Sequence, residues 1–468
     1  MPSNSLDSKE FKMSCGVDQN LYQPYDFEDQ LWRDKSHPMY NEMWYYLSHI
    51  CVAMNNNGYL VKDKATDKWT QLSNKKSVVI KLNNERSGLV SLPSGISQRL
   101  GWKEIDEYIN NYIPSLEAPV QIPFANDFVI CGSSKRINVW YDNILRPEIN
   151  NIQYLTEFLT MIRESLCAGE GTKDLNEMIA EITDPNGQKE YRFLMNWLAA
   201  IYQRPGMNLQ TNLWLIGPVK GIGKGTLIRI LESIFGSGVG KASVSDMERG
   251  WNNFIEGRLI LEADEFKASN KADFNSMIKR DTTNPTISIN ARNKTPYSIP
   301  NITNWIFTTN DDNPLMVEDG DRRNVFIHTT NNEEWKQRSI ELNTLLNNPE
   351  HNKKVATGFA AILSRIEIDY RLISMSFDTD IKSSMRAGSK NAVESWIDMD
   401  DSIVYDKWMR PNELFKDYYI PWVQIYFHST TIKSIQAWGR QMGSIGYTNK
   451  RIQIRGVGPN KEYKILEP

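Results

Sequence analysis

The stretch NLWLIGPVKGIGKGTLIRILESIFG, from Asn212 to Gly236, constrains the fold more than any other part of the chain. Its first residues form a short apolar run typical of a buried strand, which stops at a glycine-rich turn. After Lys224 the apolar residues recur at helical spacing: Leu227, Ile228, Ile230, Leu231 and Ile234. Strand and helix patterns then alternate to about residue 330, which predicts an α/β core with a parallel sheet.

The glycine-rich turn is typical of loops that bind phosphate groups. Glycines allow backbone N–H groups to converge on phosphate oxygens, and a helix N-terminus adds partial positive charge. Lys224 would reach the β- and γ-phosphates of ATP. The residues that we expect to bind the nucleotide are Gly217, Gly221, Gly223, Lys224, Gly225 and Thr226.

The turn departs from the G-x-x-x-x-G-K-[ST] pattern at two places. Pro218 holds the position of the first glycine, and Gly217 comes one residue early. Gly225 follows Lys224, so the hydroxyl that would ligate Mg²⁺ comes one residue late, from Thr226. The alternative is a glycine turn with a structural role only.

Two later strands end in polar residues. RLILEADEF (258–266) ends in Asp264 and Glu265. We expect Asp264 to help to hold Mg²⁺ and Glu265 to polarise the attacking water. NWIFTTND (304–311) ends in Asn310, whose carboxamide would orient that water. The alternatives are a solvated acidic strand end and an ordinary turn asparagine.

Arginines and a basic hairpin complete the pattern. GDRRNVFI (320–327) places Arg322 and Arg323 before another strand, and either could reach a neighbouring subunit's γ-phosphate in a ring. TISINARNKTPYSIP (286–300) predicts a hairpin whose tip carries Arg292, Asn293 and Lys294 and would grip single-stranded DNA. Surface arginines and a solvated turn are the alternatives.

Taken in this order, GPVKGIGKGT, LILEADEF, the basic hairpin, IFTTN and DRRNVFI resemble superfamily-three helicases of the phage, plasmid and satellite primase-helicase branch, related to poxvirus-type enzymes. The resemblance covers roughly residues 190–330. It implies a P-loop AAA+-like core that hydrolyses ATP with Mg²⁺, as a homohexameric ring around DNA. It also implies roles for Lys224 and Thr226 in nucleotide binding and for Thr226 and Asp264 at the metal.

The C-terminal residues carry a local positive charge, although the net charge of the chain is −3. Residues 430–468 contain seven lysines and arginines against two glutamates. Two helical patterns and a hairpin resemble a winged helix, with a protein-docking winged fold as the alternative. The residues that we expect to contact DNA are Lys433, Arg440, Lys450, Arg451 and Arg455.

We therefore expect a flexible tail (1–24), a mixed α+β accessory region (25–165), an ATPase core with a helical lead-in (166–345), a helical connector (346–400) and a winged helix (401–468). The first 190 residues show no catalytic pattern for a primase. The polar N-terminus, the absence of a long apolar run and four scattered cysteines predict a cytoplasmic protein with no membrane partner.

These patterns predict an ATP-dependent replicative DNA helicase of a phage, plasmid or other mobile element. Its partners would be single-stranded and forked DNA, further copies of itself, and a primase or polymerase. One alternative is an ATP-binding origin initiator without productive unwinding. A small-molecule kinase is a third reading, because GKGT also occurs in adenylate-kinase-type loops. The patterns give neither the polarity of movement nor the origin sequence.

Overall fold

The computed structural model consists of two units, residues 1–315 with 321–379 and residues 316–320 with 380–468. The structure describes residues 13–24, 47, 49–54, 58–63, 66, 68–85, 89–91, 97–99, 102–111, 113, 115–116, 120–125, 128–131, 134–140, 142–148, 152–265, 271–291, 296–311, 314–315, 317–318, 320–389, 393, 396, 408–409, 411–426, 434–444, 448–452 and 460–464.

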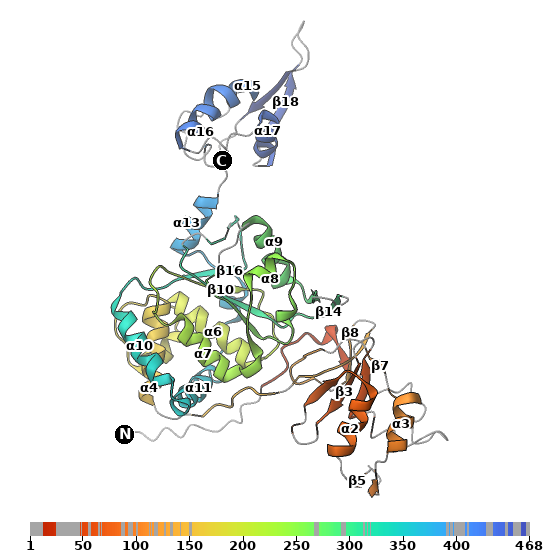
Figure 1. Cartoon of the computed structure of the whole chain (residues 1–468). Helices are drawn as coiled ribbons and strands as arrows, with labels where there is room; N and C mark the ends of the chain where they lie inside the picture. The colour runs from red at the N-terminus through yellow and green to blue at the C-terminus, as the bar shows by residue number, and fades with distance from the viewer. Residues whose placement is uncertain are drawn as a thin grey trace. The chain divides into compact units, whose positions relative to one another are not determined.

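A five-stranded sheet forms the centre of the first unit (Figure 1). Its strands lie in the order β11-β12-β15-β10-β16 and every neighbouring pair is parallel. Their bounds are β10 (Asn212–Ile216), β11 (Val239–Lys241), β12 (Ile260–Ala263), β15 (Asn304–Thr309) and β16 (Asn324–His328). The predicted α/β class and parallel sheet are therefore confirmed.

The three central strands of this sheet are buried along their whole length, as expected where helices cover both faces. On one face Trp214 stacks on Phe307 at 4.1 Å between ring centroids, and Phe274 of α9 (Lys271–Thr283) meets Phe307 edge-on. Helices α6 (Lys189–Gln203), α7 (Lys224–Phe235) and α11 (Pro349–Leu363) pack against one another.

Further elements surround the sheet. The helices are α4 (Ile152–Thr160), α5 (Leu175–Thr183), α8 (Val244–Glu248), α10 (Glu334–Leu346) and α12 (Tyr370–Ser374), with short 3₁₀ turns at Gly236–Gly238 and Asn253–Ile255. A π-helical turn, η3 (Met161–Leu166), directly follows α4. Strands β13 (Thr286–Ile289) and β14 (Tyr297–Pro300) form the antiparallel hairpin that the sequence predicts.

The N-terminal residues form smaller sheets. A four-stranded sheet has the order β4-β3-β2-β7, and helices α2 (Lys75–Glu85) and α3 (Trp102–Asn111) share its apolar core. The remaining elements are η1 (Gln19–Leu21), β1 (Gln23–Pro24), β2 (Cys51–Met54), β3 (Gly58–Lys62), β4 (Trp69–Leu72), β5 (Leu89–Ser91), β6 (Ser97–Arg99), β7 (Ser115–Leu116), β8 (Phe128–Cys131) and β9 (Ser134–Ile137). Strands β3 and β4 pair as an antiparallel hairpin.

The second unit contains short helices and an antiparallel sheet of order β17-β19-β18. Its elements are α13 (Asp380–Ser389), β17 (Trp408–Met409), α15 (Pro411–Glu413), the π-helical turn η6 (Leu414–Tyr419), α16 (Ile420–Tyr426), α17 (Ile435–Ser444), β18 (Thr448–Ile452) and β19 (Asn460–Lys464). Its apolar core includes the buried residues Trp396, Tyr419 and Trp438. Pro421 is the second residue of α16, and the helical segment that begins at η6 continues through it.

Candidate functional site

The polar residues predicted from three separate motifs meet at the carboxyl edge of the five-stranded sheet. The glycine-rich turn (217–223) follows β10, Asp264 follows β12 and Asn310 follows β15. Strand β10 lies between β15 and β16, so chain order reverses beside it. Crevices at such a reversal are the usual ligand sites of open parallel sheets.

The ammonium group of Lys224 lies at the centre of this edge. Its Nζ donates to the carbonyl oxygens of Gly217 at 3.4 Å and Thr309 at 3.2 Å. It also donates to Oδ1 of Asn310 at 3.1 Å. Burial lowers the pKa of Lys224; the Asp264 carboxylate opposes this shift, and the Lys220 ammonium adds to it. The group is a half-buried cation that neutral oxygens balance incompletely, so an anionic ligand would stabilise it.

Backbone conformation explains two of the glycines in the turn. Gly221 and Gly223 have φ angles of 78° and 108°, in the left-handed region that favours glycine. A Cβ at Gly223 would also lie 2.3 Å from Sδ of Met161. Gly223 is the N-cap of α7, so the turn presents its N–H groups at a helix N-terminus.

Gly217 has a packing role. A Cβ at this position would lie 1.9 Å from Oγ1 of Thr329, just beyond β16. Gly217 therefore permits β10 and β16 to pair closely at the end where the turn begins. This contact accounts for its position one residue earlier than the glycine of the usual loop pattern.

Thr226 lies in the first turn of α7 and is almost fully buried. Its hydroxyl oxygen has no hydrogen-bond partner among the described residues, and burial of such a group is unfavourable until it is satisfied. Gly225, in contrast, is exposed, and a Cβ there would meet nothing within 4 Å. The open space therefore lies over Gly225, beside the first turn of the helix.

The two acidic residues differ in their surroundings. Asp264 Oδ1 accepts hydrogen bonds from the Thr308 hydroxyl and from the backbone N–H of Glu265. The carboxylate of Glu265 is exposed, with Lys220 Nζ at 3.8 Å as a weak solvent-screened partner. Glu265 has φ 47°, a strained conformation for a residue other than glycine. Asp264 is thus held by two hydrogen bonds, whereas Glu265 has an exposed side chain and a strained backbone.

The structure does not bring Arg322 and Arg323 to this edge. Both precede β16, and the backbone N–H of Asn212 at the start of β10 donates to the carbonyl oxygen of Arg323. They therefore lie at the amino edge of the sheet, about 13 Å along β16 from its carboxyl end. Arg322 is exposed, whereas Nε of Arg323 is buried without a partner among the described residues.

Supports of the turn were not predicted from sequence. Ser165 in η3 donates its hydroxyl to the carbonyl oxygen of Ile222 at 2.6 Å, and its own carbonyl accepts from Thr330 N–H. Met161 of the same π-helical turn packs under Gly223. Single π-turns occur frequently at functional sites. Thr308, which was also not predicted, lies on β15 two positions before Asn310, and this spacing is the one sequence signal that could have indicated it.

Several predicted DNA contacts lie outside the described residues: Arg292, Lys294, Lys433 and Arg455. For Lys450 and Arg451 the structure describes the backbone, in β18. Arg440 is exposed on α17. No helix within the described residues has the length and apolar character that a membrane crossing requires.

Comparisons with known proteins find similarity to one phage protein in particular. Residues 215–323 match a family described as "Family of unknown function (DUF5906)". The chain is 30% identical over 193 residues to the DNA primase-polymerase of Nitratiruptor phage NrS-1. That match covers 39% of this chain and 25% of the phage protein, so the chain spans about a quarter of the length of this curated relative.

Solved structures of the NrS-1 C-terminal region share the fold. One apo structure matches with a TM-score of 0.57 and 18% identity over 94% of this chain and 100% of that one. A second, the A form, matches with a TM-score of 0.56 and 17% identity over 89% and 96%. At this identity the likeness concerns the fold.

Proposed function

We propose that this chain is an ATP-driven DNA helicase in the replication of a phage or related mobile element. The observation that carries the proposal is the convergence of Lys224, Asp264 and Asn310 at one sheet edge, beside a glycine turn that opens a helix. The similarity to a phage primase-polymerase supports a role in DNA replication.

Each residue at the edge has a chemical task in ATP hydrolysis. Lys224 and the N–H groups of the turn hold the phosphates, and the nucleotide replaces the neutral oxygens now around Nζ. Glu265 polarises the attacking water and Asn310 orients it. Mg²⁺ would neutralise charge on the β- and γ-phosphates, held by Asp264 with Thr226, whose orphaned hydroxyl supports the fit.

A ring arrangement accounts for the arginines. Arg322 and Arg323 lie at the edge opposite Lys224 in their own subunit, so they could stabilise transition-state charge at a neighbour's site. This supports a homo-oligomer, and the resemblance implies a hexamer. Mixing Lys224→Ala subunits with Arg322→Ala or Arg323→Ala subunits tests it. The arginine that acts in trans is the one whose mixture recovers hydrolysis, through sites with a normal Lys224 and a neighbour's normal arginine.

Contacts to DNA would come from two regions. The tip of the β13–β14 hairpin, with Arg292 and Lys294, would grip the single strand. The second unit, in which α17 exposes Arg440, would act as a winged helix and bind duplex or origin DNA. A primase or polymerase would be supplied as a partner.

The test is strand separation of a forked DNA with ATP hydrolysis followed in the same reaction. We expect DNA to stimulate hydrolysis and the duplex arm to separate. If the chain binds duplex DNA and assembles a ring with ATP but does not separate the strands, an initiator function would replace the helicase proposal. Phosphoryl transfer from ATP to a nucleoside monophosphate would replace it by a kinase.

A further inference from the structure

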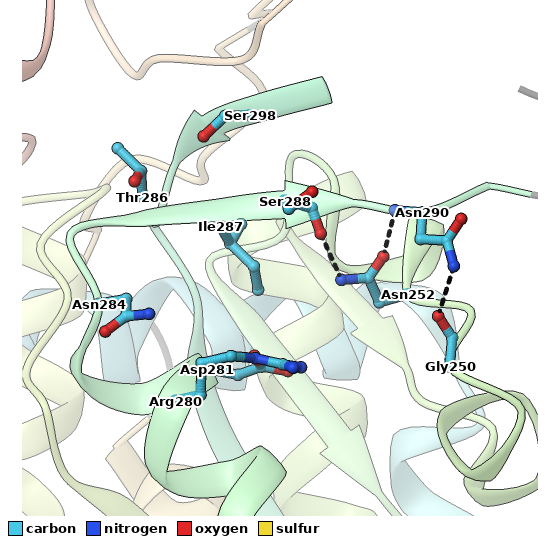
Figure 2. Close-up of a pocket in the computed structure, with 10 residues that line it drawn as sticks. All are labelled: Gly250, Asn252, Arg280, Asp281, Asn284, Thr286, Ile287, Ser288, Asn290 and Ser298. Atoms are coloured by element: carbon cyan, nitrogen blue, oxygen red, sulfur yellow. Dashed lines mark hydrogen bonds and ion pairs between the residues drawn. The ribbon is translucent and has the colours of Figure 1, made fainter. Parts of the chain in front are cut away.

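A polar hollow of about 420 Å³ lies at the base of the β13–β14 hairpin, outside the nucleotide edge. Its walls come from the loop at 250–252, the end of α9 and the two hairpin strands. Figure 2 shows β13 along one side of the hollow and Arg280 and Asp281 along the other. Its volume falls within the range of small-molecule sites.

The hollow lies at the amino edge of the sheet. Asn301, just before β15, donates its side-chain amide to the carbonyl oxygens of Asp281 and Asn284. Asn212, the first residue of β10, donates its amide to Thr282 of α9 at 3.0 Å. Strand β15 spans about 17 Å, so this site is separate from the one around Lys224.

Hydrogen bonds hold the hairpin wall in place. Asn252 accepts from the N–H of Asn290 at 2.6 Å and donates its amide to the carbonyl of Ser288 at 2.8 Å. Asn290 donates its own amide to the carbonyl of Gly250 at 3.0 Å (Figure 2). These bonds fix the hollow before any ligand enters, which reduces the entropy lost on binding.

Further polar residues line the hollow with spare hydrogen-bonding capacity, while Ile287 points from β13 toward Arg280 and Asp281 (Figure 2). Arg280 donates Nε to Asp281 Oδ1 at 2.7 Å, and its side chain is 60% exposed. The exposed residues whose side chains make no hydrogen bond within the described part of the chain are Asn284, Thr286, Ser288 and Ser298. Together they offer N–H donors, O–H groups and a carbonyl acceptor.

The charge distribution disfavours a phosphate as the ligand. The C-terminal end of α9 carries the negative end of the helix dipole, and the buried Asp281 carboxylate lies beside it. Arg280 balances that carboxylate and leaves little net positive charge. A neutral group with both donors and acceptors fits such walls, as the edge of a nucleobase does.

The predicted DNA contacts at the hairpin tip lie close to the hollow along the chain. Asn290 lines the hollow and Arg292 follows two residues later, at most about 7 Å along the chain. Phosphates gripped by Arg292 and Lys294 would carry unstacked bases within reach of the hollow. We propose that this hollow binds a nucleobase of the single DNA strand. The inference rests on the proposed function, because its ligand is the strand that the ring would hold.

The test compares binding of a mixed-sequence single-stranded oligonucleotide with binding of an abasic oligonucleotide of equal length, by fluorescence anisotropy. Asn284→Ala should weaken binding of the normal strand by about threefold to tenfold and leave binding of the abasic strand unchanged. Ser298→Ala should act in the same direction. Asn176→Ala, an exposed asparagine of α5, is the matched control and should change neither.

Two outcomes would overturn the base contact. Equal losses of affinity for the normal and the abasic strand would show that Asn284 contacts the sugar-phosphate backbone. No loss of affinity for either strand would show that the hollow does not bind DNA. Neither result affects the helicase proposal, since ATP hydrolysis and unwinding by the wild-type chain are measured separately. A wild-type chain that neither hydrolyses ATP nor binds single strands would remove both proposals.

Discussion

Lys224 Nζ lies 3.1 Å from Oδ1 of Asn310, and this bond joins the helix after the glycine turn to the end of β15. Asn310 thus contacts the cation that would hold the γ-phosphate. A change of side chain at Asn310 should alter both the binding of ATP and its hydrolysis.

Asn310→Asp should lower ATP affinity by at least about tenfold, because the new carboxylate would pair with Lys224 and repel the phosphates. Asn310→Ala should keep more affinity than the aspartate variant while losing hydrolysis. Equilibrium binding of a fluorescent ATP analogue distinguishes the two. Unchanged affinity in Asn310→Asp would separate this pair from the nucleotide site.

Nucleotide binding should take up a proton at alkaline pH. Burial lowers the pKa of Lys224 in the ligand-free chain below its ordinary value of 10.5, and adjacent phosphates would raise it again. Between the two pKa values the lysine gains a proton on binding, so affinity should fall as pH rises through the lowered pKa. Calorimetry in buffers of different ionisation enthalpy measures this uptake.

Lys224→Arg provides the control for that titration, since a guanidinium stays protonated throughout this range. Its binding should take up no proton. Equal uptake by the arginine variant would assign the proton to another group.

Substitutions of the two carboxylates should differ in their effects on hydrolysis and on binding. Glu265→Gln should reduce hydrolysis by about a hundredfold or more while ATP still binds, because its exposed carboxylate would act on water and not on the nucleotide. Asp264→Asn should weaken Mg²⁺-dependent binding as well. Single-turnover hydrolysis and binding assays measure these effects, with the exposed Glu367→Gln as control. Rapid hydrolysis by Glu265→Gln would contradict the assignment.

Gly217→Ala should destabilise the fold by about 1–3 kcal/mol, since its Cβ would meet Thr329 Oγ1 at 1.9 Å. The buried Thr329 hydroxyl has no hydrogen-bond partner among the described residues. Gly217→Ala combined with Thr329→Ala should therefore recover most of the stability. Urea unfolding measures the free energy, with Gly225→Ala as a comparison that meets no clash. A stable single variant would refute the packing role.

That Lys224, Asp264 and Asn310 share one edge of the sheet could be predicted from sequence, because all three lie beyond strand ends. Asp264 and Asn310 each follow an apolar run, and the carboxyl ends of parallel strands share one edge. The helix after Lys224 could also be predicted, because its apolar residues recur at helical spacing.

Contacts between distant segments could not be predicted in this way. Ser165 supports Ile222 across 57 residues, and Thr329 lies behind Gly217 through the pairing of β10 with β16. The hollow at the hairpin base joins three separate segments, and its asparagines and serines read in sequence as ordinary turn residues. Tertiary packing, which the local pattern does not encode, brings these groups together.

ATP hydrolysis by the wild-type chain and by Lys224→Ala, each with and without single-stranded DNA, tests the central claim most directly. We predict DNA-stimulated hydrolysis by the wild type, a loss of at least about a hundredfold in Lys224→Ala, and normal rates in the control Lys353→Ala. Hydrolysis by Lys224→Ala at the wild-type rate would show that the glycine turn is not the ATP site and would contradict the account.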